Sequence, residues 1–274
     1  MPELPEVQTV VNTLSPKVSG SVIISGRLIR SDILTPADCD FIADIVGHRV
    51  PTVFRRAKRI VFAMDDGNHF YIHLGMTGRI RIEPPDAPLA RHTHLLLDFR
   101  TGTGDIFQVR FIDPRRFGGV WWLGRNCDDP NLGPEPLNLN SKALASRLQG
   151  TTRFIKSTLL DQAVIAGLGN IYVDEALHAS GIHPLTRTHR LKPEQIAALS
   201  KAIKAVLNRA IKHRGSTLRD YMDVEGRAGE FQKIHRVYDR EDQPCLKCGE
   251  KVRRIVVGGR STHFCPVCQP RKAR

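Results

Sequence analysis

The segments Cys245-Leu246-Lys247-Cys248 and Cys265-Pro266-Val267-Cys268 stand sixteen residues apart near the end of the chain. In a reducing compartment, two Cys-x-x-Cys pairs at this spacing are typical of one tetrahedral Zn²⁺ site with four thiolate ligands. Disulfide bonds are the alternative for the same four cysteines in an oxidising compartment. The zinc interpretation predicts a β-hairpin clamped at its base by the metal. Because such a site has no open coordination position, we expect the zinc to be structural.

The residues around this hairpin are strongly basic, and so is the whole chain. From Cys245 to Arg274 there are eight Lys or Arg residues and one acidic residue, Glu250. Gly258 and Gly259 allow a tight turn that would project Arg260 from the tip of the hairpin. The 274-residue chain has a net charge of +13, which predicts a polyanionic partner such as nucleic acid. An anionic membrane surface is the alternative, but no basic amphipathic helix stands out in the sequence.

Composition also bears on size and compartment. With 41% hydrophobic residues, the chain is long enough for two domains that each have a core. No apolar run approaches the roughly 20 residues that a membrane-spanning helix needs. The acidic, proline-containing start does not resemble a secretory signal peptide. We therefore expect a cytoplasmic protein that does not bind membranes.

The hydrophobic pattern changes along the chain from a β period to a helical one. Apolar residues mark one face of a helix predicted over residues 5–18. Short β-type runs separated by turn signals then follow at 21–28, 59–64, 69–74, 79–83, 94–99 and 107–112. After a proline-rich linker at 128–139, helices are predicted at 141–149, 154–161, 171–179 and 193–213. The pattern predicts an α+β chain with an N-terminal helix and antiparallel β-sandwich (residues 1–130), a helical domain (131–232) and a zinc finger (233–274).

The chain begins Met1-Pro2-Glu3-Leu4-Pro5-Glu6-Val7, and this start has a structural and a chemical interpretation. Structurally, it is a proline- and glutamate-rich approach to the first helix. Chemically, removal of Met1 would leave Pro2 with a free secondary amine, and N-terminal amines titrate at about 7.7–8.0. Such an amine is nucleophilic near neutral pH, and its attack on a sugar aldehyde carbon gives an iminium that acts as an electron sink. Glu3 places an acid beside it.

Two glycine-bounded turns combine apolar and basic side chains, which is unusual for a solvated loop. The segment His73-Leu74-Gly75-Met76-Thr77-Gly78 presents Met76, and the segment Asp113-Pro114-Arg115-Arg116-Phe117-Gly118 presents Arg115 and Phe117. These side chains are suited to act as wedges in a base stack, with the arginine filling the gap or pairing with the orphaned base. The alternative is that Met76 and Phe117 belong to the hydrophobic core.

Two further segments are candidates for nucleic-acid contacts. Arg55-Arg56-Ala57-Lys58-Arg59 is a second basic stretch, in which alternation would let one lysine face a cleft; a solvated charged face is the alternative. The segment Ala166-Gly167-Leu168-Gly169-Asn170-Ile171-Tyr172 joins two short predicted helices. The N–H groups at the start of the second helix can hold a phosphate.

In combination, these segments resemble the formamidopyrimidine-DNA glycosylases, bacterial 8-oxoguanine repair enzymes of the helix–two-turn–helix group. The similarity runs from Pro2 to Gln269. It rests on PELPEV (2–7), RRAK (55–58), HLGM (73–76), DPRRFG (113–118), GLGNIY (167–172) with Glu175, and the four-cysteine finger with Arg260. Leu4 favours this family over the related endonuclease VIII group, which typically carries glycine at that position.

The resemblance implies a monomeric, bifunctional DNA glycosylase/AP lyase that removes oxidised purines from damaged double-stranded DNA by β,δ-elimination. Pro2 would be the Schiff-base nucleophile and Glu3 the acid for glycosidic cleavage and ring opening. Lys58 would act in β-elimination, and Arg260 at the phosphate lost in δ-elimination. The implied DNA-contacting residues are His73, Met76, His92, Arg115, Phe117, Arg153, Asn170 and Tyr238. Glu6 and Glu175 would shape the catalytic pocket, and residues 217–231 would cover the extruded base.

The sequence departs from the family pattern at three positions. Arg219 stands where many relatives carry lysine, and Asp239 stands where glycine is usual, which predicts an altered turn after Tyr238. Thr77 occupies a variable position that bears on lesion preference. Two other functions remain as alternatives: an endonuclease VIII-like enzyme for oxidised pyrimidines, and a non-catalytic zinc-ribbon DNA-binding protein. The intact Pro2-Glu3 start argues against the second, because a pure binder needs no processed proline.

Overall fold

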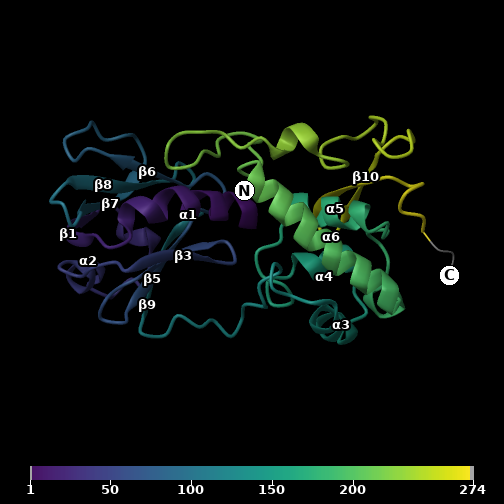
Figure 1. The fold of residues 1–274 in the computed structure, drawn as a ribbon, viewed down its shortest axis with the longest axis horizontal. Helices are drawn as coiled ribbons and strands as arrows, with labels where there is room; N and C mark the ends of the chain where they lie inside the picture. The colour runs from purple at the N-terminus through teal and green to yellow at the C-terminus, as the bar shows by residue number, and fades with distance from the viewer. Residues whose placement is uncertain (1, 272–274) are drawn as a thin grey trace. The chain divides into compact units, whose positions relative to one another are not determined.

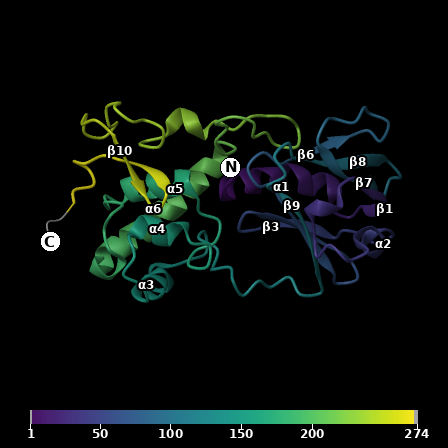
Figure 2. The same cartoon turned by 180° about the vertical axis from the view of Figure 1, so that it is seen from behind.

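The computed structural model describes residues 2–271, which pack into two compact units. The first unit comprises residues up to 129 together with 213–230, and the second comprises 130–212 together with the residues from 231 onwards. Figures 1 and 2 show the chain from opposite sides. Within residues 2–271, no helix has both the length and the apolar character needed to cross a membrane.

The first unit contains two β-sheets packed as a sandwich. One sheet has the order β1-β7-β8-β6 and is antiparallel throughout. The other has the order β2-β9-β5-β4-β3, in which β2 runs parallel to β9 and the remaining neighbours are antiparallel. The strands are β1 (Val22–Leu28), β2 (Leu34–Thr35), β3 (Thr52–Arg56), β4 (Arg59–Ala63), β5 (His69–His73), β6 (Arg79–Glu83), β7 (Thr93–Arg100), β8 (Ile106–Ile112) and β9 (Gly119–Gly124). The structure thus confirms the predicted antiparallel sandwich.

Helix α1 (Leu4–Val18) buries its apolar face in the core of this sandwich. Val7, Val10 and Leu14 are almost completely buried in the same cluster as Phe62 and Phe70. Burial of each such side chain contributes about 1.5–3 kcal/mol. The helix packs against β3 and β4, and Figure 1 shows it in purple along the sandwich. This packing fixes the start of the chain, where the candidate catalytic residues lie.

The structure adds elements that the sequence pattern did not predict. These are the strands β2, β3 and β9, the short helix α2 (Phe41–Ile45) and the 3₁₀ turn η1 (Ser31–Ile33). Strand β3 contains Arg55 and Arg56, so its sequence looks like a solvated charge run rather than a strand. Strand β9 begins directly after the DPRRFG motif, whose turn character hides it.

The second unit is helical and ends in a two-stranded hairpin. Its helices are α3 (Ser141–Gln149), α4 (Ile155–Leu160), α5 (Asn170–Ala179) and α6 (Pro193–Lys212), with the 3₁₀ turns η2 (Thr188–Arg190) and η3 (Phe231–Ile234). The hairpin pairs β10 (Arg253–Val257) with β11 (Arg260–Phe264). Strand β11 packs against α5, and Figure 2 shows the yellow hairpin beside that helix. Both the helices and the hairpin were predicted.

Helices α4 and α5 are joined by two consecutive turns that depend on one side chain. The Gln162 amide donates to the carbonyl oxygens of Leu160 and Leu168 at 3.0 and 2.9 Å. Its carbonyl oxygen accepts the N–H of Gly167, at 2.9 Å. Because these bonds satisfy backbone groups that the turns leave unpaired, Gln162 stabilises the helix–two-turn–helix connection.

Residues 213–230 pack onto the first turn of α1, within the first unit. The N–H of Ser216 donates to Glu6 Oε1 at 2.6 Å, and the Tyr221 hydroxyl donates to the Glu6 carbonyl oxygen at 3.1 Å. Gly215 makes this approach possible. Its φ is +74°, and a Cβ at this position would lie 2.5 Å from Glu6 Oε1.

We predict that Gly215→Ala lowers the free energy of unfolding of the first unit by about 3 kcal/mol, because it adds left-handed backbone strain and disrupts a hydrogen bond to a charged group. Gly104→Ala is the matched control: Gly104 also has a positive φ (+95°), but a Cβ there would meet nothing within 4 Å. That variant should lose only about 1 kcal/mol. Urea unfolding followed by tryptophan fluorescence measures this unit, because both tryptophans lie in β9. Equal losses in the two variants would contradict the role of Gly215.

Candidate active site and nucleic-acid interface

Pro2 and Glu3 are buried at the N-terminal end of α1, where Glu3 is the N-cap residue. The predicted removal of Met1 falls on a residue outside those described. The Glu6 carboxylate accepts the N–H of Glu3 at 2.8 Å, which closes a capping box over the first turn. With the Ser216 N–H on its other oxygen, this carboxylate fixes the backbone next to Pro2.

Lys58 lies in the tight turn that joins β3 to β4, beside Ala57, whose φ is +55°. The Lys58 side chain is mostly buried, unlike that of a solvated charge run. Arg55 connects this turn to α1: its guanidinium donates to Gln8 Oε1 at 2.8 Å and to the Ala57 carbonyl oxygen at 3.0 Å. The turn that carries Lys58 and the helix that carries Glu3 are therefore held together by Arg55.

His73, at the end of β5, is held as a neutral imidazole. Burial is the main cause that lowers the pKa of His73 to about 4, and the positive charges of Lys58 and Arg59 contribute to the same shift. Its Nδ1 accepts the N–H of Gly75 at 3.1 Å. In a neutral ring with Nδ1 as acceptor, the proton is on Nε2, so His73 can donate one hydrogen bond there.

The two predicted wedge loops carry exposed apolar side chains. Met76 is 42% exposed and Phe117 is 56% exposed, so the alternative that they are core residues is wrong. The Arg115 guanidinium carbon lies 4.6 Å from the centre of the Phe117 ring. His92 is exposed with a φ of +66°, and its carbonyl oxygen accepts the N–H of Asp113 at 3.0 Å. The structure therefore joins His92 to the start of the Arg115 loop.

In the second unit, the four cysteine sulfurs fit a single zinc ion. All four lie within 4.8 Å of one another, with Sγ–Sγ distances of 3.9 Å for Cys245–Cys268 and 3.4 Å for Cys248–Cys265. Tetrahedral ligands at Zn–S distances of about 2.3 Å lie about 3.8 Å apart. None of the six cysteines is joined to another in a disulfide, so the disulfide alternative is wrong. His178 of α5 lies with Nε2 3.5 Å from Cys245 Sγ, where it can support a metal-bound thiolate.

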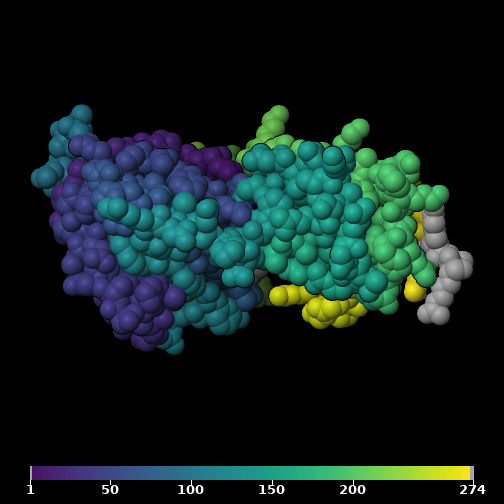
Figure 3. All heavy atoms as spheres, turned by 90° about the horizontal axis from the view of Figure 1, so that it is seen from below, coloured from purple at the N-terminus to yellow at the C-terminus, as the bar shows by residue number. Residues whose placement is uncertain are grey.

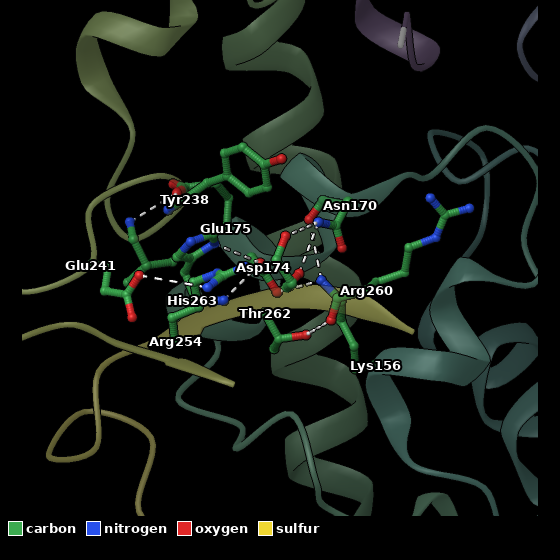
Figure 4. A network of polar contacts seen from close by, with 12 residues as sticks. Lys156, Asn170, Asp174, Glu175, Tyr238, Glu241, Arg254, Arg260, Thr262 and His263 are labelled. Carbon is green, nitrogen blue, oxygen red and sulfur yellow. Dashed lines mark hydrogen bonds and ion pairs between the residues drawn. The ribbon is translucent and has the colours of Figure 1, made fainter. Parts of the chain in front are cut away.

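A buried ion pair fixes the hairpin against the helices of the same unit (Figure 4). Lys156 Nζ donates to Asp174 Oδ1 at 2.5 Å, and both side chains are almost completely buried. The other oxygen of Asp174 accepts the N–H of His263 in β11 at 3.0 Å. Asn170, the first residue of α5, donates from its side-chain amide to the Ser261 carbonyl oxygen at 2.9 Å. These contacts hold Asn170 and the hairpin in one arrangement.

Glu175 positions the loop that carries Tyr238. Its carboxylate accepts the N–H groups of Arg236, Val237 and Tyr238 at 2.9–3.0 Å. The next residue, Asp239, has a φ of +59°. Aspartate tolerates this left-handed conformation, so the departure from glycine at this position leaves the tight turn possible.

Arg260 and Arg153 are both exposed but differ in their surroundings. Figure 4 shows the Arg260 side chain extending away from the polar network. A Cβ on Gly258, at the hairpin tip, would lie 3.0 Å from Ser157 Oγ of α4. Figure 3 shows yellow C-terminal residues against the teal part of the same unit. Arg153, in contrast, donates to Asp161 at 2.9 Å.

Several residues that hold these sites in place were not found from the sequence. They are Arg55, Asp113, Lys156, Gln162, Asp174 and His178. Arg55 and Asp113 lie inside the RRAK and DPRRFG motifs, so their position was a usable signal. Asp174 precedes Glu175 directly, but nothing in the sequence links it to a lysine 18 residues earlier.

In a comparison with known proteins, three parts of the chain each match a known domain. Residues 1–120 match the formamidopyrimidine-DNA glycosylase N-terminal domain, residues 132–222 match the H2TH domain of that enzyme, and residues 242–271 match the zinc finger found in FPG and IleRS. The chain is 45% identical to the formamidopyrimidine-DNA glycosylase of Chloroflexus aurantiacus, over 98% of both chains. It is 43% identical to that of Dinoroseobacter shibae, over 98% of this chain and 100% of the relative.

Solved structures agree with these matches. A variant of the Lactococcus lactis enzyme bound to Fapy-dG-containing DNA superposes with a TM-score of 0.89 at 34% identity, over 98% of this chain and 100% of that one. The same values hold for the L. lactis enzyme bound to DNA with an abasic site. The chain therefore belongs to the formamidopyrimidine-DNA glycosylase family.

Proposed function

We propose that this chain is a bifunctional DNA glycosylase/AP lyase that excises oxidised purines, such as 8-oxoguanine and formamidopyrimidines, from double-stranded DNA. The observation that carries the proposal is the buried Pro2-Glu3 pair at the start of α1, tied through Arg55 to the turn that contains Lys58. Glu3, Lys58 and the Pro2 nitrogen, which becomes an amine once Met1 is removed, belong to one unit of the chain, and this supports the proposal.

The chemistry begins with the amine of Pro2, which is free once Met1 is removed. Its nitrogen attacks C1′ of the damaged nucleotide, and the C1′–N bond to the base breaks as Glu3 protonates the base. The Pro2 nitrogen then gives up its proton, which returns Glu3 to the acid form. The nitrogen lone pair expels O4′ from C1′ as Glu3 protonates O4′, which opens the sugar ring. The product is an iminium at C1′, which makes the C2′ protons acidic. Loss of a C2′ proton, assisted by Lys58, expels the 3′-phosphate. A second elimination, assisted by Arg260, expels the 5′-phosphate.

Each unit supplies groups for DNA. In the first, His73 can donate from Nε2 to a phosphate, and His92 lies in an exposed turn. Met76, Arg115 and Phe117 would fill the gap left by the extruded nucleotide. In the second, Asn170 at the start of α5, the half-buried Tyr238, Arg153 and Arg260 are phosphate contacts.

In this proposal the protein acts as a cytoplasmic monomer associated with the bacterial nucleoid through DNA. Residues 1–130 hold the catalytic chemistry, 131–232 the helix–two-turn–helix contacts and 233–274 the zinc finger. Glu6 and the 217–231 segment support the pocket, because Glu6 holds Ser216 over the first turn of α1. Glu175 supports the DNA contact of Tyr238.

The first prediction from this proposed function concerns the nucleophile, Pro2. Borohydride should trap the Met1-processed protein covalently on an 8-oxoguanine duplex. Reduction converts the iminium into a stable amine, in which the Pro2 nitrogen stays bonded to C1′. Pro2→Gly with an added N-terminal extension should not trap, since its backbone nitrogen is an amide. Equal trapping by this variant, or no adduct with the processed protein, would disprove the mechanism. Faster cleavage at thymine glycol than at 8-oxoguanine opposite cytosine would indicate an endonuclease VIII-like specificity instead.

The second prediction concerns His73. Its pKa of about 4 in the folded unit lies below the value of about 6.5 for an unfolded histidine. As the pH falls from 6.5 to 4, the unfolded state takes up this proton first, so the free energy of unfolding falls by about 3 kcal/mol. In His73→Asn, whose side-chain oxygen can still accept the Gly75 N–H, this part of the pH dependence should disappear. Urea unfolding by tryptophan fluorescence between pH 4.5 and 7.5 measures the difference. If the free energy of unfolding depends on pH identically in the wild-type protein and in His73→Asn, the prediction is wrong.

The third prediction concerns the zinc site. Cys245→Ser should lower zinc content and weaken binding to lesion-containing duplex by about tenfold, because the hairpin no longer presents Arg260 to a phosphate. The unfolding of the first unit, followed by tryptophan fluorescence, should not change. Cys127→Ser is the control, since Cys127 is an exposed cysteine outside the cluster, and it should leave zinc content and affinity unaltered. Retained zinc and affinity in Cys245→Ser would count against the assignment.

A further inference from the structure

Asp113 is completely buried, yet its carboxylate bonds to both wedge loops of the first unit. Oδ1 accepts the Thr77 hydroxyl at 2.5 Å and the N–H of Arg115 at 3.3 Å. Oδ2 accepts the N–H of Gly118 at 2.8 Å. Thr77 follows Met76 in one loop, whereas Arg115 and Gly118 flank Phe117 in the other.

Thr77 completes the connection from its own side. Its Oγ1 donates to Asp113 and also accepts the N–H of Arg115 at 3.3 Å. One hydroxyl therefore contacts the acid and the backbone of the second loop. The proton of that hydroxyl is used by Asp113, so the Thr77 side chain links the two loops.

The two loops also touch through their backbones. A Cβ on Gly75 would lie 2.3 Å from the nitrogen of Gly118, and a Cβ on Gly118 would lie 2.3 Å from the carbonyl oxygen of His73. Neither position has room for a side chain. The backbones of the two loops are therefore in direct contact at both glycines.

Asp113 itself is fixed by the sandwich. Its N–H donates to the His92 carbonyl oxygen at 3.0 Å, and its carbonyl oxygen lies 2.8 Å from His94 Nε2. Arg116 is directed elsewhere, to Asp32 at 2.8 Å, which leaves Arg115 as the arginine that stacks on Phe117. We call the Asp113 carboxylate, the Thr77 hydroxyl and their hydrogen bonds to the two loops the clamp. The clamp is anchored to β7 through His94, and Arg115 is the arginine that it positions.

We propose that Asp113 and Thr77 are positioning residues that couple the Met76 loop to the Arg115–Phe117 loop, so that the three side chains enter the DNA as one preorganised body. The inference rests on the proposed function, and in particular on the wedge roles of Met76, Arg115 and Phe117. Its physical benefit is entropic. Side chains that are already held in register lose less freedom when they insert between bases.

The test compares two reactions of the Met1-processed protein. Excision of 8-oxoguanine from a duplex requires extrusion of the nucleotide, whereas β-elimination at an abasic site in single-stranded DNA does not. Asp113→Asn and Thr77→Val should each slow single-turnover excision from the duplex by about tenfold, the loss expected for one hydrogen bond to a charged group. The rate of β-elimination on the single-stranded substrate should change by less than about twofold. Thr77→Ser, which keeps the hydroxyl, should restore the duplex rate.

Asp98→Asn is the matched control for stability. Asp98 lies in β7 and accepts hydrogen bonds from Gln108 at 2.7 Å and from Ser25, with no contact to the wedge loops among its hydrogen bonds. This variant should leave both reactions unchanged. The double variant Asp113→Asn/Thr77→Val should be no slower than the slower single variant, because both changes break one shared interaction.

The outcomes separate the clamp from the proposed function. If the wild-type protein does not excise 8-oxoguanine, the function is wrong and the clamp falls with it. If Met76→Ala and Phe117→Ala both excise at the wild-type rate, there is no wedge to couple. If those variants are slow but Asp113→Asn and Thr77→Val match Asp98→Asn, only the clamp is wrong. Equal losses in the duplex and single-strand reactions would show that Asp113 merely supports folding, which also overturns the proposal.

Discussion

The carboxylate of Glu6 is almost completely buried, and it accepts the N–H groups of Glu3 and Ser216. A buried carboxylate is unfavourable unless hydrogen-bond donors surround it, so the interaction dictates where both backbone segments lie. Asp113 and Glu175 repeat the arrangement with other loops. In a chain with 41 basic and 28 acidic residues, these interior acids organise the backbone, while the excess of basic side chains is left for a polyanion.

Each of these acids accepts hydrogen bonds from the backbone of, or next to, a residue with a proposed role, rather than from the side chain of that residue. Glu6 fixes the backbone beside Pro2, Asp113 fixes the loop of Phe117, and Glu175 fixes the loop of Tyr238. A hydrogen bond from a main-chain N–H leaves the neighbouring side chain available for substrate. For Phe117 and Tyr238, which are exposed and half-buried, this arrangement holds the backbone in place without burying the side chain. A side chain that is already held in place loses less entropy on binding.

Sequence alone predicted the features that depend on local periodicity or spacing. Alternation identified strands such as β5 and β8, and the Cys-x-x-Cys spacing identified the zinc ligands. Strand β3 was missed because its pairing with β4 places Arg55 and Arg56 in a sheet that local charge does not reveal. The partners of Glu175 lie 61–63 residues away, so no local pattern contains them. The chemistry suggested for Pro2 and the wedge role suggested for Met76, Arg115 and Phe117 came from the residues themselves, and the roles of the other site residues came from family resemblance. The hydrogen bonds by which the buried acids hold these residues required the structure.

The exposure of Met76 and Phe117 also follows from the hydrogen bonds of a buried acid, in this case Asp113. Apolar side chains that are 42% and 56% exposed are unfavourable in the free protein, since each could gain from burial. Collapse of either loop onto the sandwich would recover that energy, but it would leave the Asp113 carboxylate buried without its donors. Because loss of those hydrogen bonds costs more than the partial burial returns, the loops stay extended. In the proposed function, this apolar surface would enter the base stack, where its burial would offset part of the energy of unstacking.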